Sequence, residues 1–147
     1  MFRSVETFLR PQTIAIVGAS ESGGAGWPRG IYENLAHEGF PVRVYLVNPR
    51  REQLWNQRVY PDFASLPEKI DLAIVIIPAE AIIDVLAEAA EAGLANALIF
   101  ASRFGEGGDD IGAARAAQLR DICDQTGLRI SGPNCMGSVS LPERLLF

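Results

Sequence analysis

The sequence predicts an α/β fold: a doubly wound, mainly parallel sheet with helices on both faces. Short apolar runs alternate with amphipathic helical stretches along the 147 residues, which is the pattern of successive βαβ units. The clearest run, 71–77, is nearly continuous in branched residues, as strands covered on both faces are. The first run, 13–17, stops at a glycine and opens into a glycine-rich loop, as the first strand of a Rossmann-like domain does.

The first helix is expected to follow that loop. Pro28 suits the first turn of a helix, where its missing N–H would have no partner, and Gly39 is a typical stop. The apolar residues Ile31, Leu35 and Ala36 recur at helical spacing. A second strand, Val42–Val47, comes directly after this helix.

The middle of the chain is less regular. Residues 58–60 are expected to form a short edge strand, and residues 63–68 a single helical turn interrupted by Pro67. The run 71–77 then makes the clearest strand, which Pro78 ends.

The second half continues the alternation. A cover helix is predicted over 79–92, with Ile82, Ile83, Leu86 and Ala90 on one face. A strand over 97–101 leads to a flexible loop, 102–108. An alanine-rich helix, capped by Asp109 or Asp110, is expected to run to about Gln125.

The chain is predicted to form a single domain over 1–147. At this length it buries about two thirds of its unfolded surface, so it needs no metal or disulfide. A strand over 128–130 precedes the turn 131–137. The apolar tail, 138–147, is expected to be the start of a following subdomain or a truncated tail.

Composition excludes several classes of protein. The net charge of −5 and the scattered arginines argue against a nucleic-acid partner, which needs a basic face. No apolar run approaches the roughly 20 residues that span a bilayer, and the charged N-terminus does not fit a signal peptide. Cys123 and Cys135 form no CxxC pair and His37 is distant, so we expect no metal site and a reduced, cytoplasmic setting.

Four loops follow the predicted parallel strands: 18–27, 48–51, 78–81 and 102–108. In an open parallel sheet, ligands bind beyond the carboxyl ends of the strands. Small residues let backbone N–H groups approach phosphate oxygens closely, and a proline presents a rigid wall suited to an aromatic base. The sequence therefore predicts a phosphorylated nucleotide at this edge.

The second strand ends in Asn48-Pro49-Arg50-Arg51. A site for the ribose 2′-OH of NAD needs an aspartate or glutamate there. A guanidinium instead matches a phosphate on the ribose, and Arg50 or Arg51 is the natural partner. This chemistry fits the 3′-phosphate of CoA and the 2′-phosphate of NADP alike, so the residues alone leave both open.

Four segments carry a resemblance to a known family: 16–20, 47–49, 75–79 and 132–137. In this order and spacing they resemble the CoA-binding domain of NDP-forming (ADP-forming) acyl-CoA synthetases, relatives of the succinyl-CoA synthetase α subunit. The resemblance covers nearly the whole chain. It implies that the Gly-Ala-Ser loop holds the CoA phosphates, that the Asn-Pro turn and the turn at Pro78 flank adenine and ribose, and that the Gly-Pro-Asn-Cys turn lies toward the acyl-transfer region.

The resemblance implies one set of cofactor-binding residues and no catalytic or metal-binding residue in this chain. The cofactor-binding residues are Gly18, Ala19, Ser20, Asn48, Pro49, Arg50, Pro78, Ser102, Phe104 and Asn134. Arg103 departs from the family pattern, which has a small residue there. Cys135, with no histidine nearby in the sequence, reads as a packing residue rather than a nucleophile.

The resemblance also implies a reaction and partners. Such synthetases join an acid to the CoA thiol through an acyl phosphate and a phosphohistidine, and His37 does not match that histidine. We therefore expect this chain to bind CoA or acyl-CoA but not to complete ligation without further synthetase domains or subunits. Two alternatives remain: a regulatory module that senses CoA or acyl-CoA, and an NADP-binding domain of the dehydrogenase type.

Overall fold

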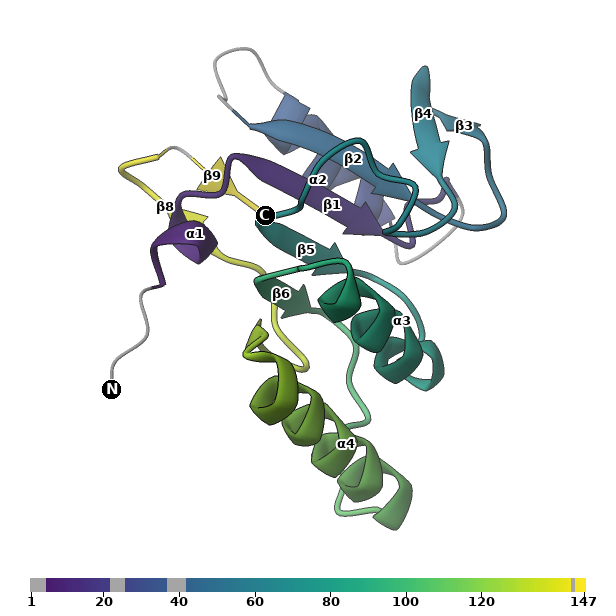
Figure 1. Cartoon of the computed structure of the whole chain (residues 1–147), viewed down its shortest axis with the longest axis vertical. Coiled ribbons are helices and arrows are strands. Elements are labelled where there is room, and N and C mark those ends of the chain that lie inside the picture. Colours follow the sequence, from purple (N-terminus) through teal and green to yellow (C-terminus); the bar gives the residue numbers. More distant parts are fainter. Residues whose placement is uncertain (1–4, 22–25, 37–41, 144) are drawn as a thin grey trace.

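The computed structural model describes residues 5–21, 26–36, 42–143 and 145–147. The helices are α1 (Glu6–Leu9), α2 (Trp27–Ala36), α3 (Ala79–Glu91) and α4 (Asp110–Thr126). The strands are β1 (Thr13–Val17), β2 (Arg43–Val47), β3 (Gln53–Leu54), β4 (Gln57–Tyr60), β5 (Leu72–Val75), β6 (Asn96–Ile99), β7 (Arg129–Ser131), β8 (Val139–Ser140) and β9 (Leu145–Leu146). Figure 1 shows the main twisted sheet with helices against it and the short hairpin of β8 and β9 apart from it.

The main sheet has the order β3-β4-β2-β1-β5-β6-β7. All neighbouring pairs are parallel except β3 with β4, which is antiparallel. The chain winds outward from β1 to β2 and β4, then returns to the other side of β1 with β5. This reversal between β1 and β5 is the topological switch point of a doubly wound sheet, so the predicted fold class is confirmed.

Each face of the sheet is covered by helices, as predicted. Alternate residues of β1 point to opposite faces. Ala15 and Val17 lie in a cluster with residues of α3 and α4, and Ile14 and Ile16 lie in a second cluster with residues of α2. Figure 1 shows α2 behind the sheet and α3 in front of it.

Helix boundaries follow the sequence signals closely where the structure describes them. Asp109 caps α4 and accepts a hydrogen bond of 2.8 Å from the backbone N–H of Gly112, and Gly127 ends the helix in the left-handed conformation. In α3 the most buried positions are Ile82, Leu86 and Ala89, so the buried face is rotated by one residue from the expected Ala90. In α2 the buried residues are Pro28, Ile31 and Leu35, whereas Ala36 is exposed. The predicted stop at Gly39 lies outside the described residues.

The strand expected over 58–60 is present as β4, but the prediction that it lies at the edge of the sheet was wrong. β4 pairs with β2 on one side and with β3 on the other, so the outermost strand is β3. The chain reverses between them at Trp55 and Asn56, whose φ angles are 51° and 58°. This hairpin was missed because its turn has positive φ angles without a glycine.

The predicted helical turn over 63–68 was also wrong. Residues 61–68 form bends and turns, in which Asp62 accepts a hydrogen bond of 2.8 Å from the N–H of Ser65 and Phe63 accepts one of 3.3 Å from the N–H of Leu66. Asp62 satisfies the local backbone donors in the same way as a helix cap. Pro67 lacks the N–H that a continuing helix would need.

The termini carry two elements that sequence reasoning did not predict. α1 precedes the sheet, and β8 pairs with β9 in an antiparallel hairpin. Arg10 joins them through an ion pair of 2.8 Å with Glu143. After this hairpin, Phe147 is buried in the cluster that includes α2.

An ion-pair cluster ties β2 to the segment before β5. Arg43 donates from Nε and Nη2 to the two carboxylate oxygens of Glu68, at 2.6 and 2.8 Å, and the Tyr45 hydroxyl donates to Oε1. The hydrogen bonds from Arg43 and Tyr45 lower the pKa of Glu68 from 4.5 to about 2. Glu68 therefore stays ionised in the folded protein at pH values where the unfolded chain takes up a proton.

This shift predicts an acid-dependent stability. A lowered folded-state pKa contributes stability that is fully present above pH 4.5 and is lost as the pH falls toward 2. We expect Glu68→Gln to reduce the loss of unfolding free energy between pH 4.5 and 2, as measured by urea denaturation at each pH. Glu91→Gln, which removes an exposed carboxylate on the neighbouring helix, is the matched control. An unchanged pH profile for Glu68→Gln would contradict the assignment.

Candidate functional site

The carboxyl ends of the parallel strands meet at one edge of the sheet. Val17 is in register with Val47 on one side and with Val75 on the other, and Val75 is in register with Ile99. The residues that follow these strands are Gly18, Asn48, Ile76 and Phe100. The predicted site loops therefore begin side by side, across the switch point between β1 and β5.

Gly18 makes the turn after β1 possible. Its φ is 87°, and a Cβ at this position would overlap the carbonyl oxygen of Ile76 and lie 2.6 Å from Cγ2 of Ile77. The Gly18 N–H donates to the carbonyl oxygen of Val47 at 2.9 Å. A residue with a side chain fits neither the angle nor the space, so this glycine sets how closely β1 and β5 approach at the site.

Asn48 ties two predicted binding loops together. Its Nδ2 donates to the carbonyl oxygen of Ala19 at 2.8 Å, and its Oδ1 accepts from the N–H of Arg50 at 2.9 Å. Ala19 is fully buried and Ser20 half-buried. The structure thus brings Gly18, Ala19 and Asn48 together directly. Both polar atoms of the Asn48 side chain are therefore occupied in holding the loop after β1 and the turn after β2 in place.

Pro49, Arg50 and Arg51 project from this edge. All three are exposed, and neither guanidinium makes a hydrogen bond or ion pair within the part of the chain that the structure describes. Two cations beyond the end of β2 favour an anionic ligand, since no carboxylate among the described residues is paired with them.

The loops after β5 and β6 complete the edge. Pro78 is exposed and stands directly before α3, and Ser102 is exposed after β6. Glu106 accepts hydrogen bonds from the N–H groups of Arg103 and Phe104, at 3.0 and 2.7 Å. A bond to its own N–H and these two backbone bonds lower the pKa of Glu106, so the carboxylate that shapes the loop stays charged.

Arg103 links the two loops. It has a φ of 78°, unusual for a residue with a side chain, and its guanidinium lies 3.2 Å from Oε1 of Glu80. Arg115 of α4 reaches the same oxygen at 3.1 Å. Sequence reasoning missed this network because its members are far apart in the chain. Arg103 departs from the small residue of the family pattern, and its side chain turns toward α3.

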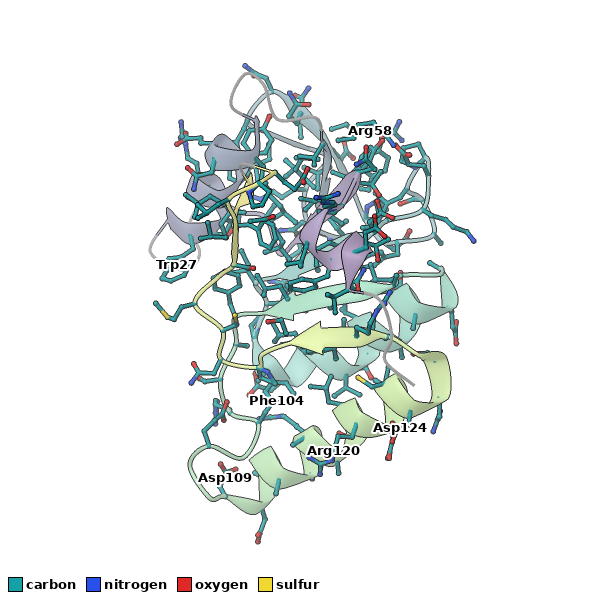
Figure 2. All side chains as sticks on the ribbon, turned by 90° about the vertical axis from the view of Figure 1, so that its left-hand side faces the viewer. Trp27, Arg58, Phe104, Asp109, Arg120 and Asp124 are labelled. Carbon is teal, nitrogen blue, oxygen red and sulfur yellow. The ribbon has the colours of Figure 1, made fainter. Side chains whose placement is uncertain are left out.

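Phe104 and Asn134 lie in different surroundings. Phe104 is only 7% exposed and packs in the cluster of α3 and α4, as Figure 2 shows between sheet and α4. Its ring therefore belongs to the core, and its backbone N–H donates to the carboxylate of Glu106. Asn134 is exposed with a φ of 58°, and its N–H donates to the carbonyl oxygen of Ala101 at 2.9 Å, so the 132–137 turn sits beside the end of β6.

Cys135 is held by the same turn. Its N–H donates to the carbonyl oxygen of Ile99 at 3.1 Å, and its thiol donates to the carbonyl oxygen of Gly137 at 3.3 Å. The side chain is partly buried against the α2 cluster. This packing agrees with the structural role that the sequence indicated. His37, Gly23 and Gly24 lie outside the described residues.

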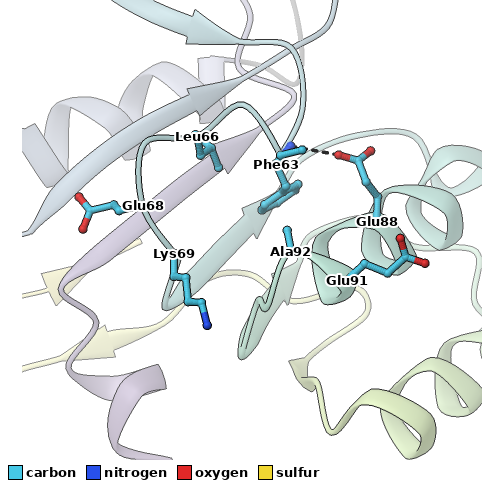
Figure 3. A pocket seen from close by; sticks show the side chains of 8 residues that line it. Phe63, Leu66, Glu68, Lys69, Glu88, Glu91 and Ala92 are labelled. Carbon is cyan, nitrogen blue, oxygen red and sulfur yellow. Dashed lines mark hydrogen bonds between the residues drawn. The ribbon is translucent and has the colours of Figure 1, made fainter.

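A cavity of about 500 Å³ lies elsewhere, between α3 and the 63–69 segment (Figure 3). The hydroxyl of Thr13, the first residue of β1, donates to the carbonyl oxygen of Lys69, so this cavity extends toward the amino edge of the sheet. Three of its lining residues are glutamates: Glu68, Glu88 and Glu91. Although Lys69 also lines the cavity and Glu68 is paired with Arg43, Glu88 and Glu91 leave its charge negative, which disfavours phosphate.

Two further classes of site are absent from the described ranges. No group of three or more histidine, cysteine, aspartate or glutamate side chains there is arranged to hold a metal ion. Within the same ranges, every helix is too short or too polar to cross a bilayer.

Comparison with known proteins decides the family. Residues 12–140 match the family described as CoA binding domain. The chain belongs to this family. Trans-feruloyl-CoA synthase from an unknown prokaryotic organism is 34% identical over 143 residues, which are 97% of this chain and 20% of that protein. ADP-forming acetate–CoA ligase II of Archaeoglobus fulgidus is 35% identical over 128 residues, which are 86% of this chain and 19% of that protein.

Similarity to solved structures supports the same family. The dinucleotide forming acetyl-coenzyme A synthetase 1 of Ca. Korarchaeum cryptofilum, in complex with phosphate and ADP, matches with a TM-score of 0.83 at 28% identity, over 97% of this chain and 30% of that one. A protein of Pyrococcus horikoshii matches with a TM-score of 0.87 at 30% identity, over 97% of this chain and 32% of that one. The predicted family, fold and cofactor are confirmed: this is a CoA-binding domain similar to those of ADP-forming acyl-CoA synthetases.

Some smaller proteins share the fold alone. A Pyrococcus furiosus protein matches with a TM-score of 0.62 at 23% identity, over 83% of this chain and 95% of that one. The architecture therefore also occurs as nearly the whole of a short chain.

Two positive-φ glycines of the first loop make a matched pair for testing how the site is built. Gly26 has a φ of 83° and no atom of the described residues within 4 Å of the position that a Cβ would occupy, whereas Gly18 also has a positive φ but no space for a Cβ. We expect Gly26→Ala to lower the unfolding free energy by about 1–2 kcal/mol, the cost of a left-handed residue, and Gly18→Ala to lower it clearly more. Urea denaturation measures both. Equal losses would mean that close packing against Ile76 is unimportant.

Asn48 offers a second test of how the loops are joined. Asn48→Asp keeps an acceptor for the N–H of Arg50 but replaces the donor that faces the carbonyl oxygen of Ala19. We expect the unfolding free energy to fall by about 1–3 kcal/mol, since a buried acceptor loses its partner. Asn34→Asp, on the exposed surface of α2, is the control. A loss no larger than that of the control would show that the tie between the loops is weak.

Proposed function

We propose that this domain binds CoA at the carboxyl edge of the sheet and presents its thiol to the acyl-transfer step of an ADP-forming acyl-CoA synthetase. The observation that carries the proposal is the bond from Asn48 to Ala19. It joins the Gly-Ala-Ser loop to the Asn-Pro-Arg turn at the carboxyl edge, beside the switch point, where a nucleotide diphosphate and a ribose phosphate would be bound together. Family membership names the nucleotide as CoA.

Each part of CoA has a matching group. The backbone of Gly18, Ala19 and Ser20 lies where it would receive the diphosphate. Arg50, exposed beside it, would bind the 3′-phosphate through paired N–H donors, with Arg51 as the alternative. Pro49 and Pro78 would flank the adenine and ribose. Ser102, the backbone at Phe104 and Asn134 would then lie along the remaining arm.

The chemical contribution of this domain would be orientation. Holding the thiol in line with an acyl phosphate lets the sulfur attack the carbonyl carbon. The C–S bond forms as the C–O bond to phosphate breaks, and the thiol proton leaves with the phosphate; such positioning lowers a barrier by several kcal/mol. The acyl phosphate and the phosphohistidine would be supplied by further domains or subunits. This chain spans only 19–20% of the length of two relatives and 30% of an α subunit from Pyrococcus furiosus.

The names of the relatives cover different acids. Feruloyl, acetyl and 4-hydroxybutyryl groups are all represented among proteins that are 30–35% identical to this chain. The acyl group used with this domain therefore has to be argued from its own residues. We also propose a cytoplasmic location and a single CoA-binding domain over residues 1–147.

A regulatory module that senses CoA or acyl-CoA is the second candidate. The observation that favours it is the occurrence of the same fold as nearly the whole of a short chain. Activity separates the two candidates: a synthetase domain supports acyl-CoA formation when its partner domains are present, whereas a sensor binds the same ligands without turnover. An NADP site of the dehydrogenase type is disfavoured by the family match.

The arginine of the Asn-Pro-Arg turn provides the direct test. We expect Arg50→Ala to weaken CoA binding about tenfold or more, as the loss of a charged hydrogen bond of about 1.5–3 kcal/mol requires, and to change dephospho-CoA binding less than twofold. Titration calorimetry measures both ligands, with NADP as a competitor and Arg51→Ala in parallel. Arg58→Ala is the matched control. It also removes an arginine, but one whose guanidinium is already engaged by the ring of Tyr60, 4.9 Å from the ring centroid.

Two results would contradict the proposal. One is tighter binding of NADP than of CoA by the unmodified chain. The other is equal weakening of CoA and dephospho-CoA by Arg50→Ala, because the 3′-phosphate would then make no contact with this arginine.

A further inference from the structure

Trp27 is an aromatic residue at the site edge that the proposed CoA contacts do not use. It is the first residue of α2, directly after the glycine-rich loop, and it is 37% exposed. Figure 2 shows it at the outside of the ribbon. Its ring meets the ring of Phe100 edge-on, with centroids 5.2 Å apart and planes at 77°. The part of the indole that remains in solvent is apolar area available to a ligand.

Phe100 places this pair at the end of β6. Its N–H donates to the carbonyl oxygen of Val75 at 3.2 Å, so its backbone extends the pairing of β6 with β5 at the carboxyl edge. A Cβ on Gly137 would lie 4.0 Å from Cζ of Phe100, so the ring also borders the 132–137 turn. Met136, the residue before Gly137, is 78% exposed. Trp27 and Phe100 thus form an apolar wall between the start of α2 and the turn that carries Asn134.

The position of this wall fits one end of CoA. In the proposed arrangement the ribose phosphate lies beyond β2 and the diphosphate beyond β1. The arm that carries the sulfur then leaves on the opposite side of β1, over β5 and β6. Neighbouring strands are about 4.8 Å apart, so β6 lies roughly 10 Å from β1, within reach of this long arm.

We propose that Trp27 and Phe100 form the acyl subsite and select thioesters of aromatic acids over acetyl-CoA and free CoA. The inference rests on the proposed function and adds the substrate class. An aromatic acyl group covers the exposed indole and gains ring contact as well as buried apolar area. An acetyl group covers too little of the two rings to gain ring contact or to bury much apolar area.

The chain contains a suitable internal control. Its other tryptophan, Trp55, stacks on Tyr32 at 5.0 Å and lies in the turn that precedes β4. That turn is at the amino end of β4, away from the carboxyl edge where the site lies. Trp55→Phe keeps an aromatic ring there and leaves Trp27 as the single tryptophan.

Calorimetric titration of the chain with CoA, acetyl-CoA and benzoyl-CoA tests the proposal. We expect the unmodified protein and Trp55→Phe to bind benzoyl-CoA about tenfold more tightly than acetyl-CoA, and Trp27→Ala to reduce this preference to less than twofold. Trp27→Leu, which keeps an apolar side chain against Phe100, is expected to lose most of the preference too. It provides the same test if the alanine variant does not fold. In Trp55→Phe, benzoyl-CoA is expected to change the fluorescence of Trp27 more than acetyl-CoA does.

The outcomes separate this inference from the proposed function. A protein that binds CoA but shows no preference for benzoyl-CoA, or keeps its preference in both Trp27 variants, overturns the acyl subsite alone. A protein that binds none of the three ligands overturns the proposed site itself, and the subsite with it.

Discussion

The close approach of Gly18 to the backbone of Ile76 is the constraint on which the site depends. With a φ of 87° and no room for a side chain, this residue lets the chain leave β1 across the edge of the sheet. Its N–H is bonded to Val47, and the next residue offers a carbonyl oxygen to Asn48. The ends of β1, β2 and β5 are therefore locked together by one glycine and one amide. The exposed residues that would meet CoA are carried on this rigid frame.

The charged side chains at the carboxyl edge of the sheet are arranged in a way that suits an anionic ligand. Although the chain has a net charge of −5, two carboxylates at the carboxyl edge are already engaged: Glu80 is paired with Arg103 and Arg115, and Glu106 accepts backbone N–H groups. Arg50 is exposed there without such a partner among the described residues. The acidic cavity beside the 63–69 segment lies on the α3 face instead. Local pairing, rather than total charge, thus decides where a phosphate is tolerated.

Sequence reasoning succeeded where a local pattern determines the structure and failed where a distant contact does. The buried strands and the cap at Asp109 are each visible in adjacent residues. The β3–β4 hairpin was missed because Trp55 and Asn56 adopt positive φ angles without a glycine. Phe104 was implied as a binding residue by the family resemblance, yet the burial of its ring depends on α4 packing over it. The contacts of Asn48 with Ala19 and of Trp27 with Phe100 join residues that no spacing rule connects.

A titration of the 15N-labelled chain with CoA, followed by amide chemical shifts, tests whether CoA binds at the carboxyl edge of the sheet. We expect the largest shifts at Gly18, Ala19, Ser20 and Arg50, with smaller ones at Ser102 and Asn134. Amides around the acidic cavity, such as those of Ala64 and Ala92, should remain unchanged. Shifts concentrated at that cavity, with the Gly-Ala-Ser loop unaffected, would contradict the placement of CoA at the carboxyl edge of the sheet.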